Sequence, residues 1–347
     1  MLKKVSVLVA GSWGTALASV LAENGRHVLL WARNEEQVQE INDKHTNHRY
    51  VKDVVLSPLI KATSSLQEAV EDADAVVMVV PSSGMRDVAS QIRPFLKADA
   101  LLIHATKGFE AGSLKRMSEV MAEELPECDP TRFVVLSGPS HAEEVVLKRP
   151  TTVVVAAQDL QAAEAAQDLF INGYFRVYTN ADVTGVEVAG ALKNIIGLGA
   201  GLTDGLSFGD NAKAALVTRG LAEIARLGTA MGANPLTFAG LAGIGDLIAT
   251  CTSKHSRNWR AGNQIAQGIP LSQVLSDMGM VVEGVKTTKA AYELANRFEV
   301  EMPITRELHN VLFEDKSPRL AAMDLMGRVR THEMEELPSD TLTNGWK

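Results

Sequence analysis

Lys193 stands where an ammonium group could take part in acid–base chemistry. The residues one helical turn away from it are all small or apolar: Ala189, Gly190, Ile196 and Gly197. A lysine on such a helix face is either buried or turned toward a cleft, and burial lowers its pKa into the range that suits general acid–base catalysis. The alternative is a lysine whose stem runs along the surface and brings its ammonium group to water.

Lys107 directly follows a predicted strand, between Thr106 and Gly108. Active sites of open α/β sheets lie beyond the carboxyl ends of the strands, so an ammonium group there could bind a phosphate or polarise a carbonyl. Gly138 and Ser140 follow another predicted strand and are expected at the same edge. For Lys107, an ordinary solvated loop lysine is the alternative.

Further along the chain, Asp246 is expected in the first turn of a helix that follows a glycine-rich loop. Ser256 is expected to cap another helix, which Arg257 and Asn258 would begin. Free N–H groups, a fork-shaped cation and an amide together make an anion site, although a plain capped helix start explains these residues equally well. The histidines and the two cysteines lack the spacing of a catalytic triad or a metal site, so no metal is expected.

The turn after the first predicted strand resembles the dinucleotide-binding fingerprint G-x-G-x-x-G. Gly11 stands where the backbone must approach a pyrophosphate, and Gly14 where the helix packs on the strand. The helix N-terminus offers N–H groups to phosphates. Val9 stands at the first glycine position, and its branched side chain argues against a positive φ there. An ordinary strand–helix turn with packing glycines is the alternative.

The second predicted strand ends at Arg33, without the carboxylate that is typical of an NAD-preferring site. A guanidinium there could meet the 2′-phosphate of NADPH. A solvated arginine at a strand end is the alternative.

These residues need a scaffold that brings strand ends together. Strands are predicted at residues 5–9, 27–31, 75–80, 100–104, 133–136 and 152–156, with helices at residues 15–23, 35–43, 85–95 and 114–124. Near-continuous apolar strands are typical of a parallel sheet covered on both faces, so residues 1–181 are expected to form a doubly wound α/β domain. From Val183 onward helical patterns dominate, for example at residues 212–231 and 287–297. Residues 182–347 are therefore expected to form an all-α domain, with a loosely ordered tail from His332.

Length and composition restrict the classes of protein to which this chain can belong. The chain has 347 residues, which fits two globular domains. Its net charge of −8 disfavours nucleic acid as a partner.

Lys3 and Lys4 precede an uncharged stretch, residues 5–22, which resembles a signal peptide. The glycine-containing turn interrupts that stretch, and Asn24 and Gly25 close it like a helix C-cap. A cytoplasmic protein without a membrane span is therefore expected.

Eight segments, in order along residues 5–334, resemble the motifs of bacterial NAD(P)-dependent glycerol-3-phosphate dehydrogenases: GSWGTALA, VVPS, HATKG, LSGPSHAEEV, GVEVAGALKNIIGLGAGLTDGL, GDNAKAALVTRGLAEI, LAGIGDLIATCTSKHSRNWRAG and MVVEGVKTTKAAY. The resemblance implies a Rossmann-type domain joined to a helical domain, as in 6-phosphogluconate dehydrogenase-like proteins. It also implies NADPH or NADH as cofactor and the reversible reduction of dihydroxyacetone phosphate to sn-glycerol 3-phosphate for phospholipid synthesis. The oligomeric state stays open, a homodimer being one option.

The resemblance also implies roles for individual residues. Lys193 matches the proton acceptor of the family, with Lys107 stabilising charge, Asp246 orienting Lys193 and Thr250 assisting. The implied substrate contacts are Lys107, Gly138, Ser140, Asp246, Ser256, Arg257 and Asn258. The implied cofactor contacts are Gly11, Ser12, Trp13, Gly14, Arg33, Tyr50, Lys107, Ala142, Arg257, Val281 and Glu283. Val9 departs from the family pattern and puts the phosphate-binding turn in doubt.

Two other functions remain open at this point. A related two-domain β-hydroxyacid dehydrogenase would not need Arg257 to bind a terminal phosphate. A non-catalytic dinucleotide sensor would bind the cofactor, and Lys193 would be dispensable.

Overall fold

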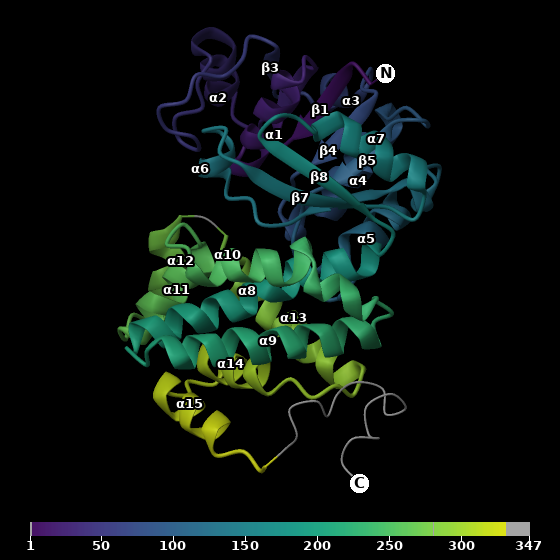
Figure 1. The fold of residues 1–347 in the computed structure, drawn as a ribbon. Helices are drawn as coiled ribbons and strands as arrows, with labels where there is room; N and C mark the ends of the chain where they lie inside the picture. The colour runs from purple at the N-terminus through teal and green to yellow at the C-terminus, as the bar shows by residue number, and fades with distance from the viewer. Residues whose placement is uncertain (1, 280, 331–347) are drawn as a thin grey trace.

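Runs of apolar and β-branched residues form the strands of a single sheet in the computed structural model, which describes residues 2–279 and 281–330 (Figure 1). The strands are β1 (Lys4–Leu8), β2 (His27–Trp31), β3 (Ile60–Thr63), β4 (Ala75–Met78), β5 (Leu101–His104), β6 (Val134–Ser137), β7 (Thr151–Ala156) and β8 (Phe175–Asn180). The predicted tail from His332 lies outside the described residues, as does the end of the resemblance at Met334.

The strand order is β3-β2-β1-β4-β5-β6-β7-β8, so the winding changes direction between β1 and β4. Val5 of β1 pairs with Val28 on one side and Ala75 on the other, both in parallel register. The doubly wound sheet is therefore confirmed, and its switch point lies where the turn after β1 meets the loop after β4.

The sheet departs from the expected pattern at three strands. β7 runs antiparallel to β6. Parallel neighbours need a connection that crosses the sheet, usually through a full helix, whereas the connection between β6 and β7 contains only the one-turn helix α6. β3 was not predicted, because its four residues, Ile-Lys-Ala-Thr, are too few and too polar to show a periodicity. β8 was not among the predicted strands either, although its first four residues alternate between buried and exposed, as expected of a strand at the edge of a sheet.

Helices cover both faces of this sheet. They are α1 (Ser12–Glu23), α2 (Glu35–Gln39), α3 (Leu66–Val70), α4 (Met85–Ile92), α5 (Met117–Glu124), α6 (Ala142–Val145) and α7 (Leu160–Phe170). Alternate strand residues point to opposite faces: Val77 packs with the buried residues of α1, α6 and α7, whereas Val76 and Met78 pack with those of α3, α4 and α5.

Two predicted helices differ in extent. The segment 35–43 is α-helical only to Gln39 and continues as a π-helical turn, Glu40–Lys44. The helix predicted from residue 114 begins at Met117, because Leu114 has a φ of 62° and cannot belong to a right-handed helix.

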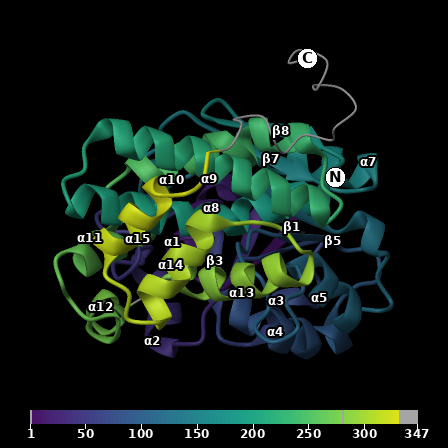
Figure 2. The same ribbon diagram turned by 90° about the horizontal axis from the view of Figure 1, so that it is seen from below.

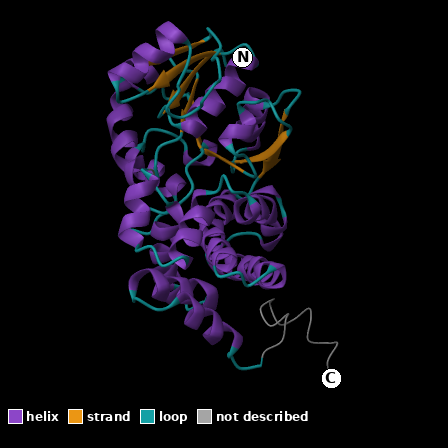
Figure 3. Ribbon diagram, turned by 90° about the vertical axis from the view of Figure 1, so that its left-hand side faces the viewer, coloured by secondary structure: helices purple, strands orange, loops and turns teal. Residues whose placement is uncertain are grey.

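The second half of the described chain consists of helices and loops, and Figure 3 shows the strands confined to the other end of the molecule. The helices are α8 (Val183–Gly205), α9 (Asp210–Ala230), α10 (Asp246–Thr252), α11 (Arg257–Ala266), α12 (Leu271–Met278), α13 (Glu283–Arg297), α14 (Pro303–Phe313) and α15 (Pro318–Met326). α8 is buried on all sides and packs against α9, α10, α11 and α13, whereas α14 and α15 lie at the outer end, nearest the viewer in Figure 2. Within the described ranges, no helix is both long and apolar enough to cross a membrane.

Glu187 on α8 ties the helical layer to the sheet. Its carboxylate accepts hydrogen bonds from Arg116 Nη1 at 2.7 Å, from Ser118 Oγ at 2.6 Å and from the Ser118 backbone N–H at 2.8 Å. The Nε2 atom of His104, at the end of β5, lies 3.1 Å from the same carboxylate. Burial alone would raise the pKa of Glu187, but His104 and Arg116 hold that pKa at about 2. The carboxylate therefore stays ionised and fixes α8 against the end of β5.

We predict that Glu187→Gln lowers the free energy of unfolding by at least about 3 kcal/mol, because it removes the buried charge that Arg116, Ser118 and His104 surround. Urea denaturation followed by circular dichroism measures this change. Glu164→Gln, at an exposed carboxylate on α7, is the matched control and should change the value by less than about 0.5 kcal/mol. Equal small effects of the two substitutions would contradict this account of the link.

Candidate active site

A lysine–aspartate cluster forms where α8, the loop after β5 and the start of α10 converge. Lys107 Nζ donates a hydrogen bond to Asp246 Oδ2 at 2.6 Å, and Lys193 Nζ lies 3.1 Å from Asp246 Oδ1. Lys193 Nζ also donates to Thr250 Oγ1 at 2.5 Å, one turn further along α10. A single carboxylate therefore holds two ammonium groups, and the structure brings together all four residues that were predicted for the chemistry.

Burial determines the electrostatics of this cluster. Only 6% of Lys193 is exposed, so its stem does not reach the surface as the alternative required. Burial lowers the pKa of Lys193 to about 8, with a further lowering by the charge of Lys107, while Asp246 opposes both. Burial alone would raise the pKa of Asp246, but the two lysines outweigh it and hold that pKa below its usual value. Lys193 can therefore give up or take a proton near neutral pH beside a permanently ionised carboxylate.

The small-residue face of α8 explains how Lys107 reaches this cluster. A Cβ atom added to Gly190 would lie 3.0 Å from Ser137 Oγ and 3.6 Å from Lys107 Cγ, so the glycine lets the end of β6 and the lysine stem pass close to the helix. Lys107 Nζ lies 3.4 Å from the carbonyl oxygen of Gly138, which also accepts a hydrogen bond from Ser140 Oγ at 3.0 Å. The two strand-end segments therefore meet at one edge, as predicted.

The start of α11 has the expected form. Ser256 caps the helix, because its Oγ accepts a hydrogen bond from the backbone N–H of Trp259 at 3.2 Å. Arg257, the first helical residue, is exposed and donates from Nη1 to the carbonyl oxygen of Val281 at 3.0 Å. This contact places the guanidinium beside a helix N-terminus, which is a suitable arrangement for binding an anion.

Asn194, which directly follows Lys193 on α8, makes a buried hydrogen bond and was not predicted as a site residue. Its Oδ1 accepts a hydrogen bond from Asn258 Nδ2 at 2.8 Å, and Asn258 Oδ1 accepts one from the backbone N–H of Gly284 at 2.8 Å. The amide chain links α8, α11 and α13 next to Lys193. A second polar residue beside Lys193, in the otherwise apolar stretch 188–202, was the sequence feature that could have revealed it.

A second group of predicted residues surrounds the N-terminus of α1. A Cβ atom added to Gly11 would meet no atom within 4 Å, so the approach to the first N–H groups of the helix is open. Ser12 Oγ donates to the carbonyl oxygen of Tyr50 at 3.0 Å. Arg33 is exposed after β2, 5.7 Å from the centre of the Trp31 ring. An open helix N-terminus with a nearby guanidinium fits the phosphates of a dinucleotide.

Val9 overturns the expectation drawn from its side chain, because its φ is 83°. The backbone N–H groups of Val9 and Ala10 both donate to the carbonyl oxygen of Trp31, at 3.1 and 2.9 Å. A Cβ atom added to Gly14 would lie 2.0 Å from the Val9 carbonyl oxygen, so α1 packs directly on the turn. These contacts hold the turn in the conformation that the fingerprint requires, although a valine occupies the glycine position.

The remaining predicted cofactor residues lie at helix starts or on α1. Trp13 is half-buried on α1, and Ala142 is buried at the start of α6. Glu283 begins α13, and Ser82 Oγ donates to its Oε2 at 3.3 Å, so it contacts the loop after β4. Burial raises the pKa of Glu283, and the charges of Lys286 and Arg257 oppose that rise.

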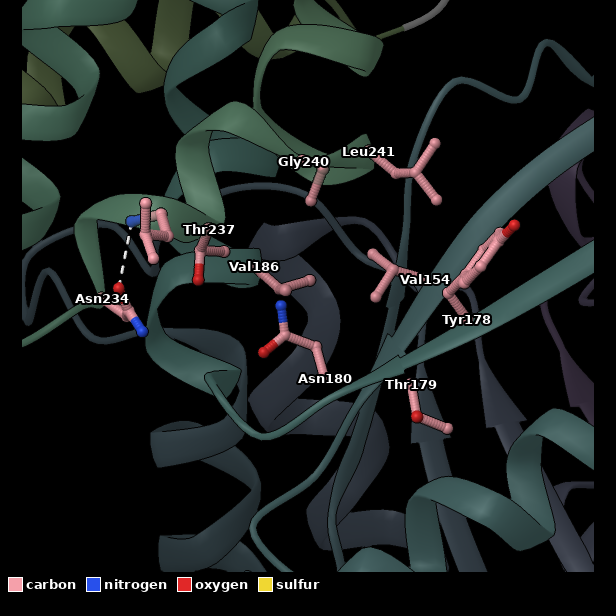
Figure 4. Close-up of a pocket in the computed structure, with 11 residues that line it drawn as sticks. Val154, Tyr178, Thr179, Asn180, Val186, Asn234, Thr237, Gly240 and Leu241 are labelled. Carbon is pink, nitrogen blue, oxygen red and sulfur yellow. Dashed lines mark hydrogen bonds between the residues drawn. The ribbon is translucent and has the colours of Figure 1, made fainter.

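A separate pocket of about 320 Å³ lies between β8 and the 3₁₀ segment Pro235–Ala239 (Figure 4). Its lining residues are Val154, Tyr178, Thr179, Asn180, Val186, Asn234, Leu236, Thr237, Gly240, Leu241 and Ala242. These residues include none of the predicted site residues, so the chemistry is assigned to the lysine–aspartate cluster.

Two protein-family models together match nearly the whole described chain. A family model described as NAD-dependent glycerol-3-phosphate dehydrogenase N-terminus matches residues 4–163, and one described as NAD-dependent glycerol-3-phosphate dehydrogenase C-terminus matches residues 182–323.

Individual proteins agree with this match. The chain is 58% identical over 336 residues to "Glycerol-3-phosphate dehydrogenase [NAD(P)+]" of Bacillus subtilis (strain 168), covering 97% of each chain. It is 59% identical over 335 residues to the protein of the same name from Bacillus cytotoxicus, covering 96% of this chain and 98% of the relative. A crystal structure of glycerol-3-phosphate dehydrogenase from Coxiella burnetii is similar with a TM-score of 0.90 and 37% identity, covering 94% of this chain and 99% of that one.

We predict that Asp246→Asn lowers the pKa of Lys193 by at least about one unit, because it removes the charge that stabilises the ammonium form. Carbon-13 NMR of lysine side chains over a pH series measures this pKa. Asp204→Asn is the matched control, since Asp204 pairs with Lys213 at 2.8 Å elsewhere on α8. An unchanged Lys193 pKa in Asp246→Asn would mean that the carboxylate does not control the lysine.

Proposed function

The chain belongs to the NAD-dependent glycerol-3-phosphate dehydrogenase family, and we propose on that premise that it reduces dihydroxyacetone phosphate to sn-glycerol 3-phosphate for glycerophospholipid synthesis. It is an NAD(P)-dependent oxidoreductase, with NADH or NADPH as cofactor. The family match does not favour a β-hydroxyacid dehydrogenase or a non-catalytic sensor. The observation that carries the proposal is the Asp246 carboxylate, which holds Lys193 and Lys107 at the sheet edge where open α/β proteins bind ligands.

We assign residues 1–181 to the cofactor and residues 182–347 to the substrate. Supporting this division, β8 ends at Asn180 and α8 begins at Val183, while residues 331–347 lie outside the described part. The cofactor half would bind the pyrophosphate at Gly11 and the first turn of α1, with Arg33 near the ribose of the adenosine.

The proposed mechanism divides the reduction between a hydride and a proton. When bound, the reduced nicotinamide supplies a hydride to C2 of the substrate. The C2 carbonyl oxygen then gains electron density, which the ammonium group of Lys107 stabilises. Lys193 donates a proton to this oxygen and is left as a neutral amine, so that the carbonyl becomes a hydroxyl. Asp246 keeps Lys193 charged and oriented until that transfer, and Thr250 accepts a hydrogen bond that fixes the lysine rotamer.

The substrate phosphate is assigned to the start of α11. Arg257 and the N–H groups of the helix offer charge and directed donors, and Ser256 and Asn258 fix the position of this helix start through their own hydrogen bonds. Holding the phosphate there would present C2 to Lys193. The start of α11 is bonded to α8 next to this lysine, because Asn258 Nδ2 donates a hydrogen bond to Asn194 Oδ1.

A cytoplasmic location and a homodimer are further parts of the proposal. Both cysteines are free thiols, which suits a reducing compartment. A second copy could cover the apolar face of α15, where Leu320, Met323 and Met326 are 48%, 69% and 88% exposed.

We predict that Lys193→Ala reduces kcat at least about a hundredfold and leaves cofactor binding unchanged, because it removes only the proton donor. In the parent protein, reduction should slow as the pH rises through about 8, since the ammonium form is lost there, whereas glycerol 3-phosphate oxidation should accelerate. Absorbance at 340 nm measures the rates, and fluorescence titration measures cofactor binding. Lys289→Ala, at an exposed lysine of α13, is the control. Near-normal turnover in Lys193→Ala would refute the assignment.

We predict that Arg257→Ala raises the KM for dihydroxyacetone phosphate at least about tenfold, because it removes a charged donor to the phosphate. Steady-state kinetics at saturating cofactor gives this value. Arg260→Ala, at an exposed arginine three residues further along α11, should leave the KM close to that of the parent protein. Equal KM values for the two variants would place the phosphate elsewhere.

A further inference from the structure

Val9 is held in a conformation that a β-branched residue rarely adopts. Its φ is 83°, a region that favours glycine, and Val9 occupies the first glycine position of the fingerprint. The carbonyl oxygen of Trp31 fixes this turn from one side by accepting the N–H groups of Val9 and Ala10. Such strain persists only where the surroundings fix the backbone by several contacts.

The other side of the turn is fixed as well. The carbonyl oxygen of Ala10 accepts hydrogen bonds from Gln37 Nε2 at 2.6 Å and from the buried Asn47 Nδ2 at 3.0 Å. Asn47 Nδ2 also donates to Thr15 Oγ1 on α1 at 2.8 Å. The backbone is therefore preformed for a dinucleotide, and the valine differs from glycine there by its side chain.

The side chain of Val9 lies at the switch point of the sheet. Val9 directly follows β1, is half-exposed, and packs against the buried cluster that includes Trp31 and Val80. Val80 belongs to the loop after β4, on the opposite side of the crevice where dinucleotides bind in doubly wound sheets. The isopropyl group therefore covers part of the crevice floor that a glycine would leave open.

We propose that Val9 sets the cofactor affinity of this site, and the proposal rests on the proposed function only in requiring that the protein bind NAD(P)H. The isopropyl group keeps the dinucleotide away from the floor between β1 and β4, so both NADH and NADPH bind more weakly than they would over glycine. NADH and NADPH differ only at the 2′-phosphate, and the floor between β1 and β4 faces a part of the cofactor that both share. The valine therefore weakens the binding of NADH and of NADPH by the same factor. Arg33, at the end of β2, is placed to discriminate between them.

Two substitutions separate the side chain from the backbone. Val9→Ala removes the two methyl groups and keeps a Cβ atom at positive φ, whereas Val9→Gly also removes the backbone strain. Fluorescence titration of NADH and NADPH measures affinity without turnover, and thermal unfolding of the cofactor-free protein measures the strain. Arg33→Ala is the matched control, which should weaken NADPH more than NADH.

We expect both variants to lower the Kd for NADH and NADPH by similar factors, at least about fivefold for Val9→Gly. We also expect Val9→Gly to unfold at a higher temperature than Val9→Ala. Unchanged or weaker cofactor binding in both variants would overturn the proposal. A higher unfolding temperature for Val9→Ala than for Val9→Gly would also overturn it, because the backbone at this position would then not be strained. A parent protein that binds NAD(P)H but does not reduce dihydroxyacetone phosphate would refute the proposed function and leave this test intact.

Discussion

The structure depends on one buried carboxylate that must neutralise two ammonium groups. Asp246 lies within hydrogen-bond distance of both Lys193 and Lys107, and its charge offsets the repulsion between the two ammonium groups. With this carboxylate in place, the pKa of the buried Lys193 is about 8. The elements around the cluster are therefore constrained to bring three distant segments of the chain to within hydrogen-bond distance.

α8 positions most of the residues that make up this site. It carries Lys193 and Asn194, its Gly190 makes room for the stem of Lys107, and its Glu187 is bonded to the end of the strand that leads to Lys107. The same helix is thus a source of reacting groups and the part that fixes them against the sheet. This double role explains why it is buried on all sides, although it carries charged residues.

Much of this arrangement could be predicted from the sequence. The apolar face around Lys193 indicated a buried lysine, the strand-end positions indicated where Lys107 would lie, and Ser256 was expected as a cap. The long motifs identified the family as well. What was not foreseen depends on residues far apart in the sequence: neither the bonds of Glu187 to Arg116 and His104 nor the direction of β7 leaves a local pattern.

The turn at Val9 marks the limit of reasoning from residue preferences. A valine disfavours positive φ, yet tertiary hydrogen bonds to Trp31, Gln37 and Asn47 outweigh that preference and impose the conformation. Local preference was a sound guide to the helix cap, where the cap residue makes its own hydrogen bond. It failed at the turn, because the deciding partners come from other elements.

The most direct test of the account compares two substrates at 340 nm. Purified protein with NADH or NADPH is given dihydroxyacetone phosphate or unphosphorylated dihydroxyacetone at the same concentration. The account predicts rapid cofactor oxidation with the phosphorylated ketone and a rate at least about a hundredfold lower without the phosphate, because the charged contacts at α11 are then lost. Equal rates with both ketones, or no oxidation while the cofactor is bound, would contradict it.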